Sequence, residues 1–197
     1  MTSVDTRERD ESAENLQPNI VILVGGGLAI GFVSLITLPG PIALASIALG
    51  VMMLAGADVD ARTFLLPNVI TWGATVGGIS SAWFLDELSP WSAASDAVLR
   101  AVCVAAFLAL LRWSYESVRH REGLGLGDVK LAAAVGAWLP FEVIPLCFGL
   151  ATGGALLTIL WGHLRGRRIE RTTKMPFGTF LCPALWLAFY VTNLPTG

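Results

Sequence analysis

Charged residues are scarce in this chain of 197 residues. They make up 14% of it, whereas about a quarter of an ordinary soluble domain is charged, and 54% of the residues are hydrophobic. The three cysteines, Cys103, Cys147 and Cys182, lie far apart in separate apolar stretches and form no CxxC pair. Their spacing excludes a zinc ribbon and a disulfide framework, so we interpret them as packing residues.

The apolar residues gather into seven long segments separated by polar linkers. A helix of about 20 apolar residues spans a bilayer and satisfies its own backbone hydrogen bonds there. No alternation of apolar and polar residues suggests the strands of a membrane barrel. The sequence therefore predicts an all-α, polytopic transmembrane helix bundle of about six to seven membrane segments. The segments are 19–38, 41–57, 68–85, 97–113, 129–139, 143–164 and 177–192.

Two features of this division need comment. Residues 1–18 are polar and mostly acidic, unlike the basic start of a signal peptide, so we expect a disordered cytoplasmic tail followed by one transmembrane domain over 19–197. The segment 129–139 is too short to span a bilayer alone. We expect it to be a tilted or partly buried helix, shielded by its neighbours.

Basic and acidic linkers alternate along the chain. Because basic linkers stay on the cytoplasmic side, the pattern predicts a cytoplasmic N-terminus and an external C-terminus. Arg100 alone opposes the pattern, near a segment end where its side chain can extend to the interface. The basic linkers contain Arg62; Arg112, Arg119 and Arg121; and Arg165, Arg167, Arg168, Arg171 and Lys174. The acidic linkers contain Asp86, Glu87 and Asp96, and Glu142.

Three carboxylates adjoin apolar segments on the predicted cytoplasmic side. Asp58 and Asp60 end the second segment, and Asp128 begins the fifth. Carboxylates close to the hydrocarbon region are costly, so they are candidates for function. The alternative is a structural one, in which Asp128 caps the helix that follows it and the stretch from Asp60 to Pro67 and Asn68 is a plain turn.

Glycines surround Asp128 in the stretch Gly123-Leu124-Gly125-Leu126-Gly127-Asp128-Val129-Lys130. Alternate glycines leave the backbone without Cβ hindrance, so a peptide substrate can approach closely and the carboxylate is exposed. A glycine-rich turn before a helix can also bind phosphate. This one follows no predicted strand, lacks the Walker pattern and carries an anion at the phosphate position, which argues against phosphate binding.

Three separated motifs resemble the type IV prepilin peptidase family of GxGD membrane aspartyl proteases. The first is Asp60-x6-Pro67-Asn68, and the second is Gly125-Leu126-Gly127-Asp128-Val129-Lys130 with its small-residue helix. The third is Pro176-Phe177-Gly178-Thr179-Phe180-Leu181 at the start of the last segment. The resemblance extends over roughly 41–197.

The resemblance implies that Asp60 and Asp128 are the catalytic pair. Asp58 competes with Asp60, but its spacing to Pro67 is two residues too long. The motif residues Gly125, Gly127, Lys130, Pro67, Asn68, Pro176, Phe177 and Gly178 are implied to form the substrate site or its framework. Lys130 lies on a different helix face from Asp128, so we expect it near substrate or headgroups.

The resemblance also implies what the protein acts on. The expected activity is aspartic endopeptidase cleavage of the short basic leader of prepilin or pseudopilin precursors, at the cytoplasmic face of the inner membrane. Larger family members carry a domain with two CxxC pairs linked to N-methylation; we find no such domain here and expect peptidase activity alone. The expected partners are the precursor protein and the bilayer, with no nucleic acid, metal or organic cofactor. The oligomeric state, the particular precursor and the protonated aspartate are left open.

Other functions remain as alternatives. Presenilin and signal-peptide-peptidase enzymes share GxGD, and Pro183-Ala184-Leu185 matches one of their motifs, but no Tyr-Asp pair is present. A small transporter or proton channel would use membrane carboxylates as a relay, although no inverted repeat is visible. A non-catalytic assembly protein of a pilus or secretion system would use the aspartates only as helix caps.

Overall fold

The computed structural model describes residues 18–119, 125–165 and 176–195. All regular structure in these ranges is α-helical, and each of the seven apolar segments corresponds to one helix, as predicted. The helices are α2 (Ile20–Thr37), α3 (Gly40–Thr63), α4 (Asn68–Leu85), α5 (Pro90–Arg119), α6 (Leu126–Trp138), α7 (Ile144–Leu164) and α8 (Gly178–Thr192). Residues 1–17 of the predicted tail, Gly123 and the linker residues Arg121, Arg167, Arg168, Arg171 and Lys174 lie outside the described ranges.

The bundle has the dimensions and surface of a multi-pass membrane protein. Within the described residues, α2, α3, α5 and α7 are long and apolar enough to cross a membrane. Large apolar side chains cover the outside: Leu28, Phe32 and Trp113 are each more than half exposed. Lipid is the solvent in which such a surface is stable, because burying it in water-free hydrocarbon replaces costly hydration.

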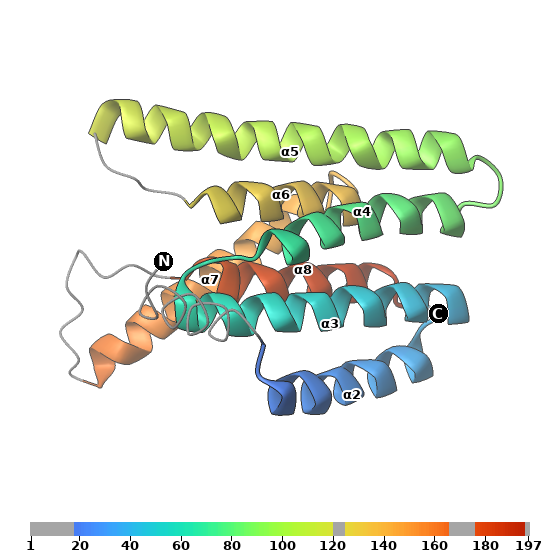
Figure 1. The fold of residues 1–197 in the computed structure, drawn as a ribbon, viewed down its shortest axis with the longest axis horizontal. Helices are drawn as coiled ribbons and strands as arrows, with labels where there is room; N and C mark the ends of the chain where they lie inside the picture. Colours follow the sequence, from blue (N-terminus) through green and yellow to red (C-terminus); the bar gives the residue numbers. More distant parts are fainter. Residues whose placement is uncertain (1–17, 120–124, 166–175, 196–197) are drawn as a thin grey trace, which may run out of the picture.

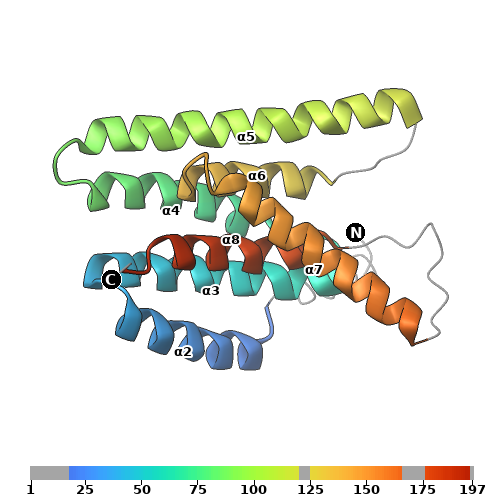
Figure 2. The same cartoon turned by 180° about the vertical axis from the view of Figure 1, so that it is seen from behind.

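The helices stack from α5 at one edge to α2 at the other. Figures 1 and 2 show α4 and α6 beside α5, then α3 and α8, then α2 at the far edge, with α7 crossing obliquely along one side. Successive helices run in opposite directions. The ends of α3, α5 and α7 therefore lie at the same end of the bundle as the starts of α4, α6 and α8.

The short helix α6 is enclosed by its neighbours, as expected for the fifth segment. Its 13 residues extend about 20 Å, less than the roughly 30 Å hydrocarbon core. A Cβ built on Gly136 would lie 2.5 Å from the carbonyl oxygen of Arg100, so glycine is needed where α6 meets α5. On the other side, the Trp138 indole donates to the carbonyl of Ala74 at 2.7 Å. Arg100 also donates to the Gly136 carbonyl at 3.3 Å.

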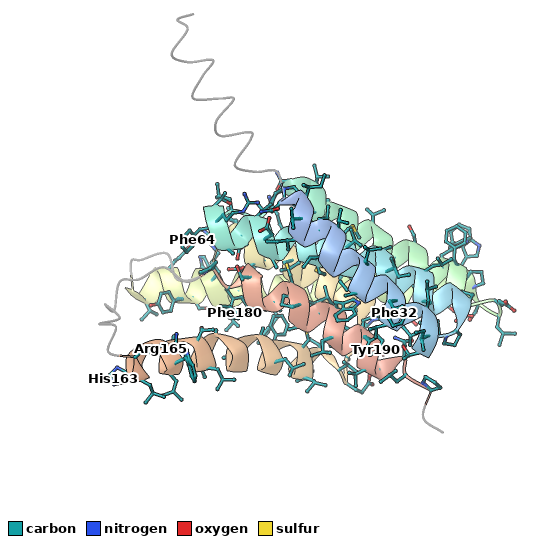
Figure 3. All side chains as sticks on the ribbon, turned by 90° about the horizontal axis from the view of Figure 1, so that it is seen from below. Phe32, Phe64, His163, Arg165, Phe180 and Tyr190 are labelled. Carbon is teal, nitrogen blue, oxygen red and sulfur yellow. The ribbon has the colours of Figure 1, made fainter. Side chains whose placement is uncertain are left out.

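The end of α3 differs from the predicted segment. The helix continues to Thr63 rather than ending near residue 57, so Asp58 and Asp60 lie inside its last two turns. Phe64 ends it in the left-handed region with φ 56°, and its N–H donates to the carbonyl of Asp60. Pro67 then precedes α4. In Figure 3, Phe64 lies toward the same end of the bundle as the labelled Arg165, away from Tyr190.

Candidate active site

Asp60 is a buried carboxyl held against the start of α8. Its residue is 4% exposed. Its Oδ2 accepts the backbone N–H of Thr179 at 2.7 Å and the Thr179 hydroxyl at 3.1 Å. A Cβ built on Gly178 would lie 2.8 Å from the same oxygen. Only glycine at 178 therefore lets α8 approach this carboxyl so closely.

Asp128 lies in the first turn of α6, at the same end of the bundle. Gly125 occupies the N-cap position and provides no side-chain cap. Asp128 interacts with the Gly125 backbone from the first turn, so the capping contact considered from the sequence remains compatible with the structure. From the third position of the helix its carboxyl points back over the turn, and a Cβ built on Gly125 would lie 3.2 Å from Oδ2. The residue is partly buried.

The two carboxyls interact electrostatically. Asp128 lies outside the four described helices that are long and apolar enough to cross a membrane, in the first turn of the short helix α6. Burial, and to a lesser degree the negative charge of Asp60, raise the pKa of the Asp128 carboxyl to about 6, while the Gly125 backbone acts in the opposite direction. When two carboxyls lie close together and the pKa of one is raised above its ordinary range, the pair can share a single proton.

A buried thiol, Cys182, lies in the same region of the bundle. This fully buried thiol lies one turn along α8 from Thr179, and the charges of both Asp60 and Asp128 act on it. A Cβ built on Gly56 of α3 would lie 3.1 Å from its sulfur. α3, α6 and α8 therefore come together around one point, with a carboxyl from each of the first two.

Leu66 fills the space between the starts of α6 and α8. A Cβ on Gly127 would lie 3.2 Å from the Leu66 Cβ, and a Cβ on Gly178 would lie 2.5 Å from its Cδ1. Both glycines are thus explained by one leucine from the loop after α3. The loop that carries Pro67 and Asn68 is fixed against both catalytic candidates through this side chain.

Lys130 ties the same loop to α6. Its ammonium donates to the side-chain oxygen of Asn68 at 2.7 Å, joining residues predicted to belong to two different motifs. Asn68 begins α4 directly after Pro67. The lysine therefore contacts the α3–α4 loop, and this bond gives it a structural partner that the sequence did not reveal.

Asp58 has other partners. Its Oδ2 accepts from Arg62 at 2.6 Å and from the backbone N–H of Asn19 at 2.7 Å. Through these contacts the Asp58 carboxylate links the end of α3 to the start of α2. The geometry favours Asp60 over Asp58 as the partner of Asp128, as the motif spacing does.

An apolar cavity of about 900 Å³ lies beside the candidate site. Phe107 and Leu111 of α5 face Ile144 and Phe148 of α7 across it, and Phe177 also lines it. Phe177 precedes Gly178, which abuts Asp60. The cavity therefore reaches the residue that precedes α8, while neither Asp60 nor Asp128 lines it. Pro176 lies partly buried immediately before Phe177.

Three residues of the site were not singled out from the sequence. Thr179 had a place only within the third motif, Leu66 only as the residue before Pro67, and Cys182 was expected to be a packing residue. Thr179 follows Pro-Phe-Gly at a helix start, where a backbone N–H has no partner within its own helix, and that was an available signal. For Leu66 the available signal was its place before Pro67 in the first motif, whereas a cysteine in an apolar segment is ordinary and carried none. Among the described residues, no group of three or more His, Cys, Asp or Glu is placed to hold a metal ion.

Fold and site together define a multi-pass helical membrane protein with two interacting aspartates at one end of the bundle. Comparison with known families identifies the class more closely: residues 47–162 match the type IV leader peptidase family. This match covers more than half of the chain and includes both aspartates. The chain belongs to the type IV leader peptidase family.

Individual relatives agree with this assignment. The chain is 35% identical over 152 residues to the prepilin leader peptidase/N-methyltransferase of Pectobacterium carotovorum subsp. carotovorum, covering 75% of this chain and 51% of the relative. It is 33% identical over 164 residues to the enzyme of the same name from Burkholderia pseudomallei, covering 82% and 50%. The corresponding protein of Xanthomonas campestris pv. campestris is 31% identical over 153 residues, covering 75% and 50%. The chain spans about half the length of these relatives, and no solved structure matches it significantly.

Proposed function

We propose that this protein is an aspartic endopeptidase that removes the short basic leader of prepilin or pseudopilin precursors. The proposal is supported by the placement of Asp60 and Asp128 at one end of the bundle. Leu66 packs there against Gly127, the neighbour of Asp128, and against Gly178, which abuts Asp60, and the charge of Asp60 acts on Asp128. Family membership and the names of the relatives supply the substrate class.

The chemistry of hydrolysis fits the pair. Peptide cleavage needs a water molecule that gives up a proton and an amine that receives one. Two neighbouring carboxyls with one proton between them perform both tasks, because the ionised one accepts the water's proton while the protonated one donates to the substrate. Their burial limits bulk water and strengthens the interaction between them.

The surroundings of the pair suit a substrate with a polar leader and an apolar stem. The site lies at the end of the bundle that the charge pattern assigns to the cytoplasm, where a leader–stem junction would lie at headgroup level. The cavity lined by Phe107, Phe148 and Phe177 offers apolar surface next to Gly178. We place the protein in the inner membrane, with a cytoplasmic N-terminus and the aspartates on the cytoplasmic side.

The decisive experiment is co-expression with candidate prepilins and pseudopilins, followed by electrophoresis to detect loss of the leader. We expect a mobility shift with at least one precursor, and mass spectrometry should place the cut at the junction between the basic leader and the apolar stem. Precursors that all stay uncut beside well-expressed enzyme would contradict the proposal.

A further inference from the structure

The hydrogen bonds to Asp60 fall on one of its two carboxyl oxygens. This asymmetry bears on which member of the pair is ionised and which carries the proton. Among the described residues, both hydrogen-bond donors to this carboxyl belong to Thr179, and both contact Oδ2. One is a backbone N–H and the other a hydroxyl, and the residues are 119 positions apart in the chain. A carboxylate with donors on one oxygen keeps the other oxygen available to water.

The backbone bond places the negative charge at the start of a helix. Thr179 is in the first turn of α8, whose N-cap Phe177 provides no side-chain cap. First-turn N–H groups lack partners within the helix, and the helix dipole favours an anion there. The Asp60 carboxylate thus serves as the missing cap of α8, delivered from α3.

The hydroxyl strengthens the same preference. Thr179 Oγ1 lies 3.1 Å from Asp60 Oδ2 and 3.5 Å from the carbonyl of Ala57, and it has one proton to donate. The shorter contact is the one to the carboxylate. Hydrogen bonds to a charged acceptor are stronger than those to a neutral one, so the hydroxyl stabilises the ionised form of Asp60.

The other groups around the pair do not cancel the preference of Thr179 for an ionised Asp60. Burial opposes the ionisation of both carboxyls, and Asp60 is only 4% exposed. The two differ in their hydrogen bonds, because Asp60 accepts a backbone N–H and a hydroxyl from Thr179, whereas Asp128 interacts with the backbone of Gly125. Cys182 of α8 is buried and neutral. Of the nearby cations, Arg62 is bonded to Asp58 and Lys130 to Asn68.

We propose that Thr179 is a positioning residue that makes Asp60 the ionised member of the pair and leaves the shared proton on Asp128. This inference rests on the proposed function, because it assigns roles within that reaction. As the water oxygen bonds to the scissile carbonyl carbon, the water's proton passes to Asp60 and the proton of Asp128 passes to the carbonyl oxygen. The proton on Asp60 then passes to the amine nitrogen as the C–N bond breaks, and Asp128 regains its proton from the hydroxyl of the collapsing intermediate.

The test compares Thr179→Val with Thr179→Ser and with Thr75→Val. Thr75 is a matched control, because its buried hydroxyl donates within α4 to the Thr71 carbonyl at 2.9 Å and does not touch either carboxyl. The full chain, labelled with ¹³C at aspartate side chains, is titrated in detergent micelles by NMR. The Asp60 and Asp128 signals are assigned from their loss in Asp60→Asn and Asp128→Asn.

We expect Asp60 to ionise at lower pH than Asp128 in the unaltered protein. Thr179→Val should move the Asp60 midpoint upward by about one pH unit, Thr179→Ser should restore it, and Thr75→Val should leave it unchanged. Equal Asp60 midpoints in the Val and Ser variants, or an Asp128 that ionises first, would overturn the inference.

Leader cleavage by the same preparations separates this inference from the proposed function. If the unaltered protein cleaves, the acidic limb of its pH profile should move with the NMR midpoint in Thr179→Val. If it cleaves no precursor, the proposed function fails, yet the titration still decides whether Thr179 orders the two ionisations.

Discussion

Asp58 and Asp60 stand two residues apart on α3 and have opposite surroundings. Two residues turn a helix by roughly 200°, so the side chains leave on different faces. Asp58 faces the start of α2, where it binds Arg62 and the N–H of Asn19. Asp60 faces α8, where Thr179 binds it and Gly178 lets the helix approach. A carboxylate paired with an arginine has its charge compensated, whereas one that meets only neutral donors and a second carboxyl remains available for proton transfer.

The sharpest test of this comparison removes each carboxylate in turn. Asp60→Asn and Asp128→Asn should each lower leader cleavage by about 10³-fold or more, because an amide cannot act as a general acid or a general base. Asp58→Asn should stay within about threefold of the unaltered enzyme, since the ion pair with the half-exposed Arg62 is lost while the asparagine oxygen can still accept the Asn19 N–H. Initial rates on a purified precursor, with membrane insertion checked for every variant, measure all three. A catalytic loss in Asp58→Asn matching that in Asp60→Asn would reverse the assignment.

The Asp60 face depends on the close approach of α8. Gly178→Ala would put a methyl group 2.8 Å from Asp60 Oδ2 and 2.5 Å from Leu66 Cδ1, so the helix or the carboxyl must shift. We expect cleavage to fall by about 10- to 100-fold, since displacements of about 1 Å at a reacting group have such effects. Gly149→Ala is the control, because no atom lies within 4 Å of its built Cβ. Equal rates for both alanine variants would show that the approach is not needed.

The partner carboxyl offers a third test through its titration. Burial and the charge of Asp60 raise the pKa of Asp128 to about 6, so we expect its ¹³C carboxyl signal to titrate near pH 6. In Asp60→Asn the charge is lost while burial remains, so the midpoint should fall but stay above the ordinary aspartate value of about 3.9. An unchanged midpoint in Asp60→Asn would mean that the carboxyls do not interact.

The smallest expected effect concerns the hydrogen bond between Lys130 of α6 and Asn68 at the start of α4. Lys130→Met removes the bond to Asn68 and should lower cleavage by about two- to fivefold, because one partly exposed hydrogen bond is lost. Asn68→Ala should act similarly, and the double variant should be no worse than either single one if the bond is their common cause. Multiplied losses in the double variant would indicate separate roles.

Much of the fold could be predicted from the sequence. The seven segments matched the seven helices because long apolar runs are nearly sufficient to specify helices in lipid, and α4 (Asn68–Leu85) coincides with its segment. Boundaries set by charge were less accurate. The prediction ended the second segment at 57, but α3 continues through Asp58 and Asp60 to Thr63, since a helix can carry polar residues beyond the hydrocarbon. Likewise α5 extends beyond the predicted 97–113 at both ends.

The sequence by itself determined the membrane class, the order of the helices and the aspartates worth testing, because hydropathy and motif spacing are local properties of the chain. Only the tertiary structure decided what surrounds each carboxyl. Thr179 lies 119 residues from Asp60, and Leu66 is locked between Gly127 and Gly178 of two other helices. Helix packing determines such partners. Because Gly178 has no side chain, α8 comes close enough for Thr179 to bind the Asp60 carboxyl.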